Sequence, residues 1–177
     1  MNERGIISIT ALCMMLILSM MIAAVANMSA RQADITRYIK LEYQLQCAAD
    51  SSFNEIITTL ATDSSYGGKI PSDDDLTDIF YLSVIPDYSG TSEINGIPVS
   101  IYLKKYHFKN EYTPTADEDM HYYRIFIITI AEKANYNYNK YSSYQSVYGY
   151  MERKFTTTHG TNEIVDDGKY EFKGYLY

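Results

Sequence analysis

The sequence of 177 residues is poor in the residue types that build metal centres and disulfide frameworks. It contains three histidines, widely spaced and without an HExxH or a Cys/His pattern, so a zinc site is not predicted. Two cysteines are too few for a disulfide framework. If one continuous helix holds both Cys13 and Cys47, they lie about 50 Å apart and cannot form a bond with each other.

The sequence also lacks the short motifs that mark many enzymes. It has no G-x-S-x-G nucleophile elbow, no Walker-type phosphate loop and no dinucleotide fingerprint. No pattern pairs a nucleophile with a base, so the sequence predicts neither an enzyme nor a bound cofactor. Basic residues are few as well, since 15 lysines and arginines stand against 22 acidic residues. This acidic balance argues against nucleic acid as a partner.

Charge, proline and glycine are all absent from residues 6–26. This apolar stretch has about the length that a helix needs to cross a bilayer, roughly twenty residues at ~1.5 Å rise each. It is too long for the apolar core of a cleaved secretory signal, which spans about 7–15 residues. We therefore predict one membrane helix over residues 6–28, with residues 1–5 before it.

The helical pattern continues beyond the membrane segment. Apolar and small residues recur there at intervals of three and four, which places them on one face of a helix. The spacing predicts that residues 29–62 continue the same helix as an amphipathic stem. Cys47 is expected to pack on it, with an intermolecular disulfide as the alternative. The recurring residues are Tyr38, Leu41, Leu45, Ala48, Ala49, Ser52, Phe53, Ile56 and Leu60.

Residues 63–177 are predicted to form a small extracytoplasmic head. Asp63 to Gly68 should end the helix, because glycines accept left-handed geometry, and Ser72 should cap a short helix to Leu82. Strands are expected where the pattern alternates, and an apolar second strand should be central. A hairpin turn is expected at Asp167-Gly168. The expected strands cover residues 97–108, 122–133, 143–157 and 169–177.

These elements predict an α+β fold. A long amino-terminal helix, its first half in the membrane, would pack on a small antiparallel sheet of three to four strands. This layout lets the sheet cover the apolar face of the helix.

The first ten residues carry a further pattern. The segment ERGIISIT, residues 3–10, resembles the leader of type IV pilins and type II secretion pseudopilins. In that family a short charged leader ends in glycine, a membrane-embedded prepilin peptidase cuts after it, and the new amino terminus is methylated. The resemblance implies cleavage between Gly5 and Ile6 and a pilin-like fold.

One position departs from the family's usual pattern. The family has a glutamate as the fifth mature residue, where this chain has Thr10. Subunits without that glutamate resemble the PilX-like and K-type minor members, which are associated with initiation or with the filament tip. The segment QLQCAADSS, residues 44–52, is similar to the Q-x-x-x-A-A-E-S/A patch of the PilX-like group. The resemblance thus implies a minor pilin or pseudopilin.

Such a subunit would anchor in the membrane and assemble into, or cap, a type IV pilus or a secretion pseudopilus. It would cross the cytoplasmic membrane once, with its amino terminus inside and its head outside, and reach the cell surface after filament assembly. Its partners would be the membrane, the prepilin peptidase and other pilin or pseudopilin subunits. Small residues that permit close helix packing in the filament are Thr10, Ala11, Ser19, Ala23 and Ala24.

An alternative function is that of an unprocessed, signal-anchored binding protein of the cell envelope, which would use a tyrosine-rich surface. The chain has 19 tyrosines and no tryptophan. Tyrosine offers a large amphipathic contact area for protein or carbohydrate recognition, although alternating tyrosines can also simply cover one side of a sheet. Six of them crowd one loop and the following strand: Tyr136, Tyr138, Tyr141, Tyr144, Tyr148 and Tyr150.

An acidic run in the head is a candidate calcium site. Clustered carboxylates supply the oxygen ligands that Ca²⁺ prefers. The run lacks the spacing and the glycine of an EF-hand loop, and acidic residues also suit the first turn of a helix. The four residues are Asp73, Asp74, Asp75 and Asp78.

Overall fold

The computed structural model describes residues 3–71, 85–110, 118–134, 142–158 and 164–176. The chain divides into two compact units, residues 1–41 and residues 42–177, and each is described by itself. The predicted helix over residues 72–82 lies outside the described residues. The elements are α1 (Glu3–Thr62), β1 (Tyr88–Ile94), β2 (Ile97–Asn110), β3 (Glu118–Ala134), β4 (Ser142–Thr158), β5 (Ile164–Asp167) and β6 (Glu171–Tyr175).

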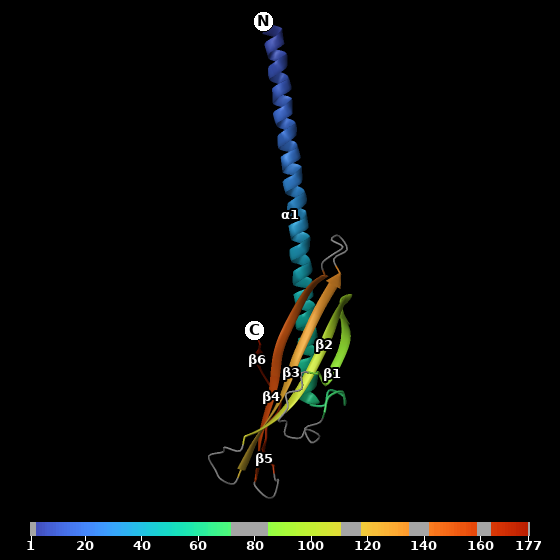
Figure 1. The fold of residues 1–177 in the computed structure, drawn as a ribbon, viewed down its shortest axis with the longest axis vertical. Coiled ribbons are helices and arrows are strands. Elements are labelled where there is room, and N and C mark those ends of the chain that lie inside the picture. Colours follow the sequence, from blue (N-terminus) through green and yellow to red (C-terminus); the bar gives the residue numbers. More distant parts are fainter. Residues whose placement is uncertain (1–2, 72–84, 111–117, 135–141, 159–163, 177) are drawn as a thin grey trace. The chain divides into compact units, whose positions relative to one another are not determined.

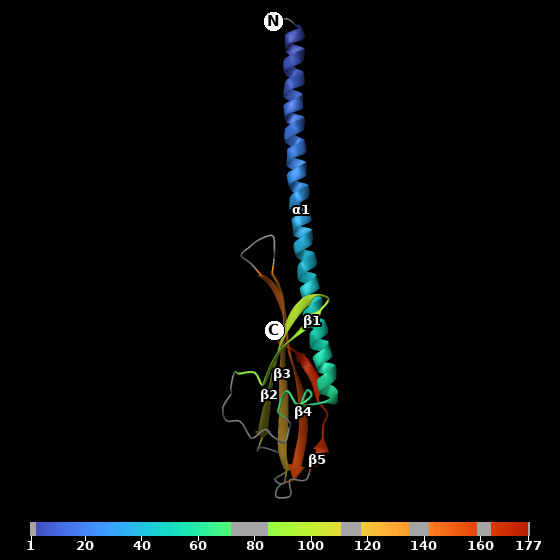
Figure 2. The same cartoon turned by 90° about the vertical axis from the view of Figure 1, so that its right-hand side faces the viewer.

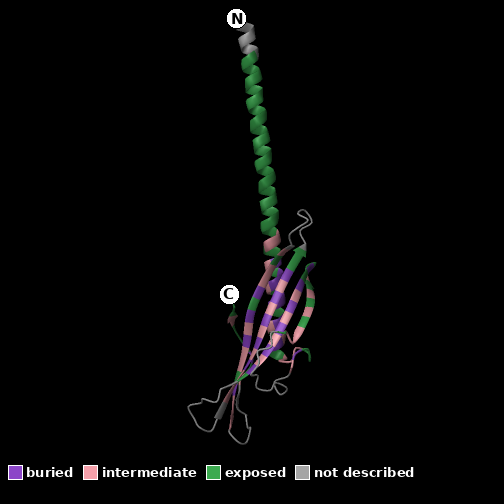
Figure 3. Ribbon diagram, viewed as in Figure 1, coloured by how far each residue is buried: buried purple, intermediate pink, exposed green. Residues whose placement is uncertain are grey.

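The first unit is the amino-terminal part of α1. Every residue from Ile9 to Lys40 is exposed, as the uniform colour of this segment in Figure 3 shows. This is the one helix in the described chain that is long and apolar enough to cross a membrane, and none of its apolar part is buried. An apolar surface on all sides of a helix suits a lipid or protein environment rather than water. The predicted membrane segment therefore has the length and composition of a single membrane span.

In the second unit, the last third of α1 covers one face of the sheet. Its buried residues follow the predicted spacing from Leu45 onward, which confirms an amphipathic helix packed on a sheet. Tyr38, predicted to belong to the same buried face, is 49% exposed, so the buried stripe begins later than predicted. The buried residues of α1 are Leu45, Ala48, Ala49, Ser52, Phe53, Ile56 and Leu60.

The helix ends at Thr62, where the sequence predicts it to end. The next turn runs through Tyr66, Gly67 and Gly68, whose φ angles of 52°, 65° and 74° are left-handed, a conformation that glycine adopts without strain. The Asp63 carboxylate accepts hydrogen bonds from the Ser65 hydroxyl (2.7 Å) and from the backbone N–H groups of Gly67 (2.6 Å) and Ser65 (2.9 Å). These donors hold the pKa of Asp63 below its usual range.

The sheet is an antiparallel meander. Strands β1 to β4 lie side by side in chain order (Figures 1 and 2), and β5 and β6 both pair with the far side of β4. The apolar strand β3 lies between β2 and β4, which confirms the prediction that it is central. The α+β fold is as predicted, with six strands instead of three to four.

The extra strands have two origins. Strand β1 was not predicted, because the residues between Tyr88 and Ile94 are small or polar and give no apolar alternation. It forms a hairpin with β2 through Asn95 and Gly96, which have φ angles of 53° and 76° as a type I′ turn requires. Strands β5 and β6 replace the single predicted last strand.

The predicted hairpin at Asp167-Gly168 is wrong. Both β5 and β6 run antiparallel to β4, so the chain keeps its direction across this segment and only interrupts its pairing. Gly168 lies against the β4 backbone: a Cβ atom there would stand 2.3 Å from the carbonyl oxygen of Lys154. The Gly168 carbonyl accepts a hydrogen bond from Arg153 Nε (2.8 Å). Close approach, rather than chain reversal, accounts for this glycine.

The core between α1 and the sheet centres on Phe53. Its side chain is fully buried and its ring meets those of Phe172 and Tyr175, with centroid distances of 5.9 and 5.5 Å. Gly149 on β4 leaves space for this ring, because a Cβ atom at that position would stand 2.5 Å from Phe53 Cζ. One polar contact joins the same layers, where Thr129 Oγ1 donates to the Ala49 carbonyl (3.1 Å). The helix is thus held on the sheet by shape and by a buried hydrogen bond.

Candidate interaction surface

The predicted cleavage site lies in the first turns of α1, where the backbone is helical from Glu3 onward. Gly5 and Ile6 follow directly after this start. The side chains of residues 1–8 are outside the description, so the resemblance to a prepilin leader rests on the sequence.

The predicted packing residues in the apolar part of α1 are all exposed within the chain. Because an α-helix turns by about 100° per residue, Ser19 and Ala23 lie on one side, Thr10 and Ala24 on the opposite side, and Ala11 between them. Ser19 Oγ donates to the Leu16 carbonyl (2.9 Å), which satisfies its hydroxyl inside the helix. Small residues therefore occur on more than one side of this helix, as contacts with several neighbouring helices require.

The sheet face opposite α1 is rich in aromatic side chains, and we call it the outer face. Cross-strand neighbours on it form a continuous row, in which Tyr102 pairs with Ile128 and Ile128 with Tyr148. Leu176 continues the row, because its backbone N–H donates to the Tyr148 carbonyl (2.9 Å). Such cross-strand pairs stabilise a sheet and also present a contiguous apolar surface.

A second row on the outer face combines aromatic rings with cations. Phe126 packs against Tyr150 and Tyr106, with ring centroids 5.8 and 5.6 Å away. The Arg124 guanidinium lies 5.9 Å from the Tyr150 ring centroid and pairs with the Glu152 carboxylate. The Arg124 and Glu152 charges are thus paired with each other, and Arg124 also lies near an aromatic ring.

The predicted tyrosine cluster is only partly within the described residues. Tyr144, Tyr148 and Tyr150 occupy alternate positions of β4 and share the outer face. Tyr144 is 65% and Tyr148 40% exposed, whereas Tyr150 is half-buried against Phe126. Tyr136, Tyr138 and Tyr141 lie outside the described residues.

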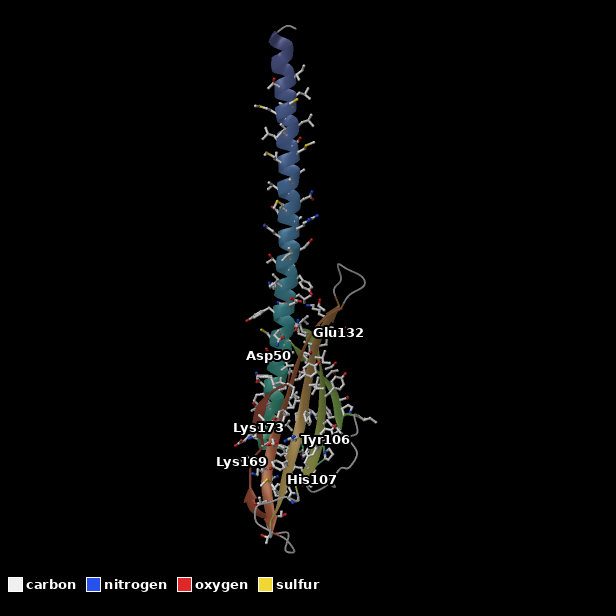
Figure 4. All side chains as sticks on the ribbon, turned by 60° about the vertical axis from the view of Figure 1, so that its left-hand side comes forward. Asp50, Tyr106, His107, Glu132, Lys169 and Lys173 are labelled. Atoms are coloured by element: carbon white, nitrogen blue, oxygen red, sulfur yellow. The ribbon has the colours of Figure 1, made fainter. Side chains whose placement is uncertain are left out.

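Two hollows lie next to each other around Tyr148 and Leu176. The apolar one measures about 290 Å³ and is also lined by Phe126, Ile127, Ile128 and Gly149. The other measures about 500 Å³ and reaches α1 at Gln46 and Asp50, which are joined by a hydrogen bond of 3.2 Å. Asp50 is labelled in Figure 4. Tyr148 and Leu176 therefore line two mainly apolar hollows, of which the larger also includes polar side chains of α1.

The first half of β4 forms an open edge of the sheet. Strand β6 pairs with β4 only from Gly149 onward. Within the described residues, no strand pairs with the edge of Ser142 to Val147 that faces away from β3. The Tyr148 carbonyl accepts a hydrogen bond from Leu176 and therefore points away from β3. The backbone groups of Ser146, two residues away on the same strand, point toward the same open edge. Open edges next to hollows are places where proteins accept partner segments.

A third hollow, of about 270 Å³, lies between α1 and the hairpin of β1 and β2, and it includes Tyr43, Cys47 and Lys133 in its lining. Cys47, expected to pack on the helix, is exposed, and both cysteines are free. A hydrogen bond that the Tyr43 hydroxyl donates to the Cys47 side chain raises the pKa of Tyr43, because it favours the protonated hydroxyl. A single thiol here is compatible with packing against another subunit and carries no further assignment.

The candidate calcium ligands, Asp73, Asp74, Asp75 and Asp78, lie outside the described residues. Among the residues that the structure does describe, no three histidine, cysteine, aspartate or glutamate side chains are placed to hold a metal ion.

Three comparisons with known proteins were made for the whole chain. No family model, no curated protein and no solved structure matches it.

The sequence did not indicate two parts of this surface. Ile128 and Leu176 belong to it because of strand register, which places them beside Tyr148 although they lie 20 and 28 positions away along the chain. The alternating pattern of residues 169–177 could have assigned Leu176 to this surface, although strand β6 itself ends one residue earlier, at Tyr175. The open edge of β4 could not be foreseen, because it depends on where β6 begins to pair.

Proposed function

We propose that this chain is a minor pilin-like or pseudopilin-like structural subunit. It would be held in the membrane by residues 6–26 until it assembles into, or caps, a type IV pilus or a secretion pseudopilus. The observation that carries the proposal is α1: its apolar first part buries nothing within the chain, while its last part covers a small antiparallel sheet. The leader-like segment before the apolar part supports the same function.

The proposed orientation places the amino terminus inside and the head outside. An acidic head suits a soluble, exposed position because like charges keep such surfaces apart. The role is one of assembly and not of catalysis, with the aromatic outer face and the open edge of β4 as contact surfaces of the head.

The proposal predicts that a prepilin peptidase shortens the chain by five residues. The full chain would be produced with and without the peptidase and its mass measured. The expected product starts at Ile6 and carries a methyl group, and a Gly5→Val variant stays uncleaved, because a branched side chain obstructs the extended backbone that a peptidase binds.

A matched control is Gly96→Asn, which changes a turn glycine of the head where a Cβ meets no atom within 4 Å and where asparagine accepts the left-handed φ, so it should be processed normally. Recovery of intact Met1 from cells with an active peptidase, or normal maturation of Gly5→Val, would rule out the pilin-like function.

The alternative, an unprocessed envelope protein that binds through tyrosines, is favoured by one observation. Tyr148 and Leu176 are 40% and 43% exposed around an apolar hollow, and such patches are frequently binding sites. The two functions differ in the fate of the amino terminus, so the mass measurement separates them.

The same surface gives a prediction for assembly. Tyr148→Ser removes a large apolar contact and is expected to lower the amount of subunit in sheared filaments by about tenfold, the effect of one interface hot spot. Tyr144→Ser is the control, since Tyr144 lies on the same face but lines neither hollow. Equal losses in both variants, or in neither, would exclude this hollow as a contact site.

A further inference from the structure

Two histidines lie next to each other on the face of the sheet that α1 covers. His107 on β2 (labelled in Figure 4) and His121 on β3 are joined by a hydrogen bond between His107 Nε2 and His121 Nδ1 of 2.9 Å. His121 Nε2 continues the chain to the Thr157 hydroxyl on β4, at 3.0 Å. This chain of bonds crosses three strands; His107 is 7% exposed, whereas His121 and Thr157 are half-buried.

Stacked rings hold the two histidines in place. His107 lies between Tyr123 and His121, with ring centroids 4.4 and 5.1 Å away and planes within 15°. His121 is stacked in turn on Phe155, at 4.8 Å and 7°. Neither imidazole can swing away from its partner without breaking this column, so the bond between them is a fixed part of the folded head.

The bond limits how many protons the pair can carry. One ring nitrogen must donate its N–H and the other must accept with a lone pair. A neutral pair satisfies this condition, and so does a pair with one added proton. Two imidazolium rings would turn N–H against N–H and place two like charges within hydrogen-bond distance, which disfavours the second proton.

The groups that face the pair come from each element packed around it. Lys105 on β2 is fully buried and donates to the Pro71 carbonyl (2.9 Å), and Arg153 on β4 lies over the Phe155 ring at 5.4 Å. Both are cations and oppose further positive charge. The other titratable residues at this end include Tyr123 and Tyr170, whose rings lie beside Lys105, and Asp63, whose field reaches Lys105. Asp119 on β3 and Asp167 on β5 stand opposite Thr157 and Phe155 in the strand register.

We propose that the His107–His121 pair is an acid-sensitive latch for the end of the head sheet where β2 passes to β3. When that end opens, the buried His107 reaches water and its bond to His121 breaks, so each histidine can take a proton, whereas the closed pair holds at most one. The open state therefore binds more protons below the ordinary histidine pKa of about 6.5, and the closed state loses stability as the pH falls.

The size of the effect follows from the one extra proton. Each pH unit below about 6 shifts the ratio of open to closed forms by about tenfold toward the open form. The shift is reversible and is confined to the strand ends around residues 107, 121 and 157. The centre of β3, from Ile125 to Ala131, stays closed.

The test is amide hydrogen exchange of the full chain in detergent micelles between pH 7.5 and 5, corrected for the intrinsic exchange rates. Amides of residues 107, 121 and 157 are expected to gain about tenfold in opening per pH unit below about 6, relative to those of residues 125–131. His121→Gln keeps a donor and an acceptor but does not titrate, so its opening should be independent of pH. His107→Gln is the second variant and should behave alike.

His159→Gln is the matched control, since it removes the chain's third histidine and should keep the full pH dependence. An equal pH dependence in wild type, His121→Gln and His107→Gln would overturn the proposal. So would NMR spectra of the ring nitrogens showing both histidines fully protonated at pH 5 without faster exchange.

Discussion

Replacing Phe53 with alanine is expected to lower the free energy of unfolding of the head by about 3–5 kcal/mol. Phe53 is fully buried, and its ring contacts Phe172 and Tyr175 on the segment that closes the sheet. Removing it leaves a cavity that a helix and a four-strand meander cannot collapse to fill. The measurement is urea unfolding of the full chain in detergent, followed by circular dichroism because the chain has no tryptophan.

The control for this prediction is Phe172→Ala. Phe172 belongs to the same cluster but is 36% exposed, so its loss should cost less than half as much. A loss below about 1 kcal/mol for Phe53→Ala would contradict the packing described above.

Gly149 provides the reciprocal experiment. A Cβ atom there meets Phe53 Cζ at 2.5 Å and the Gly174 carbonyl oxygen at 3.0 Å, so Gly149→Ala should be destabilising in the presence of Phe53. In a Phe53→Ala background the first of these clashes disappears. The double variant is therefore expected to be more stable than the sum of the two single losses, by about 1 kcal/mol or more.

The second large effect concerns the membrane. Leu16→Lys places a charge near the middle of the apolar stretch, at a residue that is 52% exposed on the isolated helix. Exchanging leucine for lysine at the centre of a membrane helix costs about 3–4 kcal/mol of insertion free energy. We expect a large fraction of the variant to be extracted from membranes by alkaline carbonate, under conditions in which the unaltered chain stays in the pellet.

Ile39→Lys is the matched control for Leu16→Lys. Ile39 is an apolar residue of the same helix with a similar exposure, 59%, but it lies outside the apolar stretch. Its replacement should leave membrane integration unchanged. If both variants integrate like the unaltered chain, or both fail, residues 6–26 do not act as the membrane segment.

Periodicity predicted the elements whose side chains face one buried layer. The face of α1 from Leu45 onward, the three long strands and the central place of β3 all follow from apolar spacing. Strand β1 was not predicted because its glycine and hydroxyl side chains give no apolar alternation, although the Asn95-Gly96 pair beside it is a hairpin-turn signal. The hairpin predicted at Asp167-Gly168 was wrong because, in the sequence alone, a glycine required by close backbone approach cannot be told from a glycine in a turn.

The candidate surface and the histidine pair were less accessible to sequence reasoning. Alternation placed Tyr144, Tyr148 and Tyr150 on one face, and the structure has them there. The neighbours of Tyr148, and the contact of His107 with His121, depend on the register between strands. Register is set by the whole set of packed residues and by turn geometry, and no short motif encodes it.

The meander sets an order for the folding of the chain. Strands β1 to β4 pair with sequence neighbours, so each hairpin can close as soon as its two strands are available. The bond from Thr129 to the Ala49 carbonyl instead spans 80 positions, although α1 is synthesised first. The apolar face of α1 therefore waits uncovered until β3 and β4 arrive, which makes the docking of the helix a late step in folding and the period before it the one most exposed to aggregation.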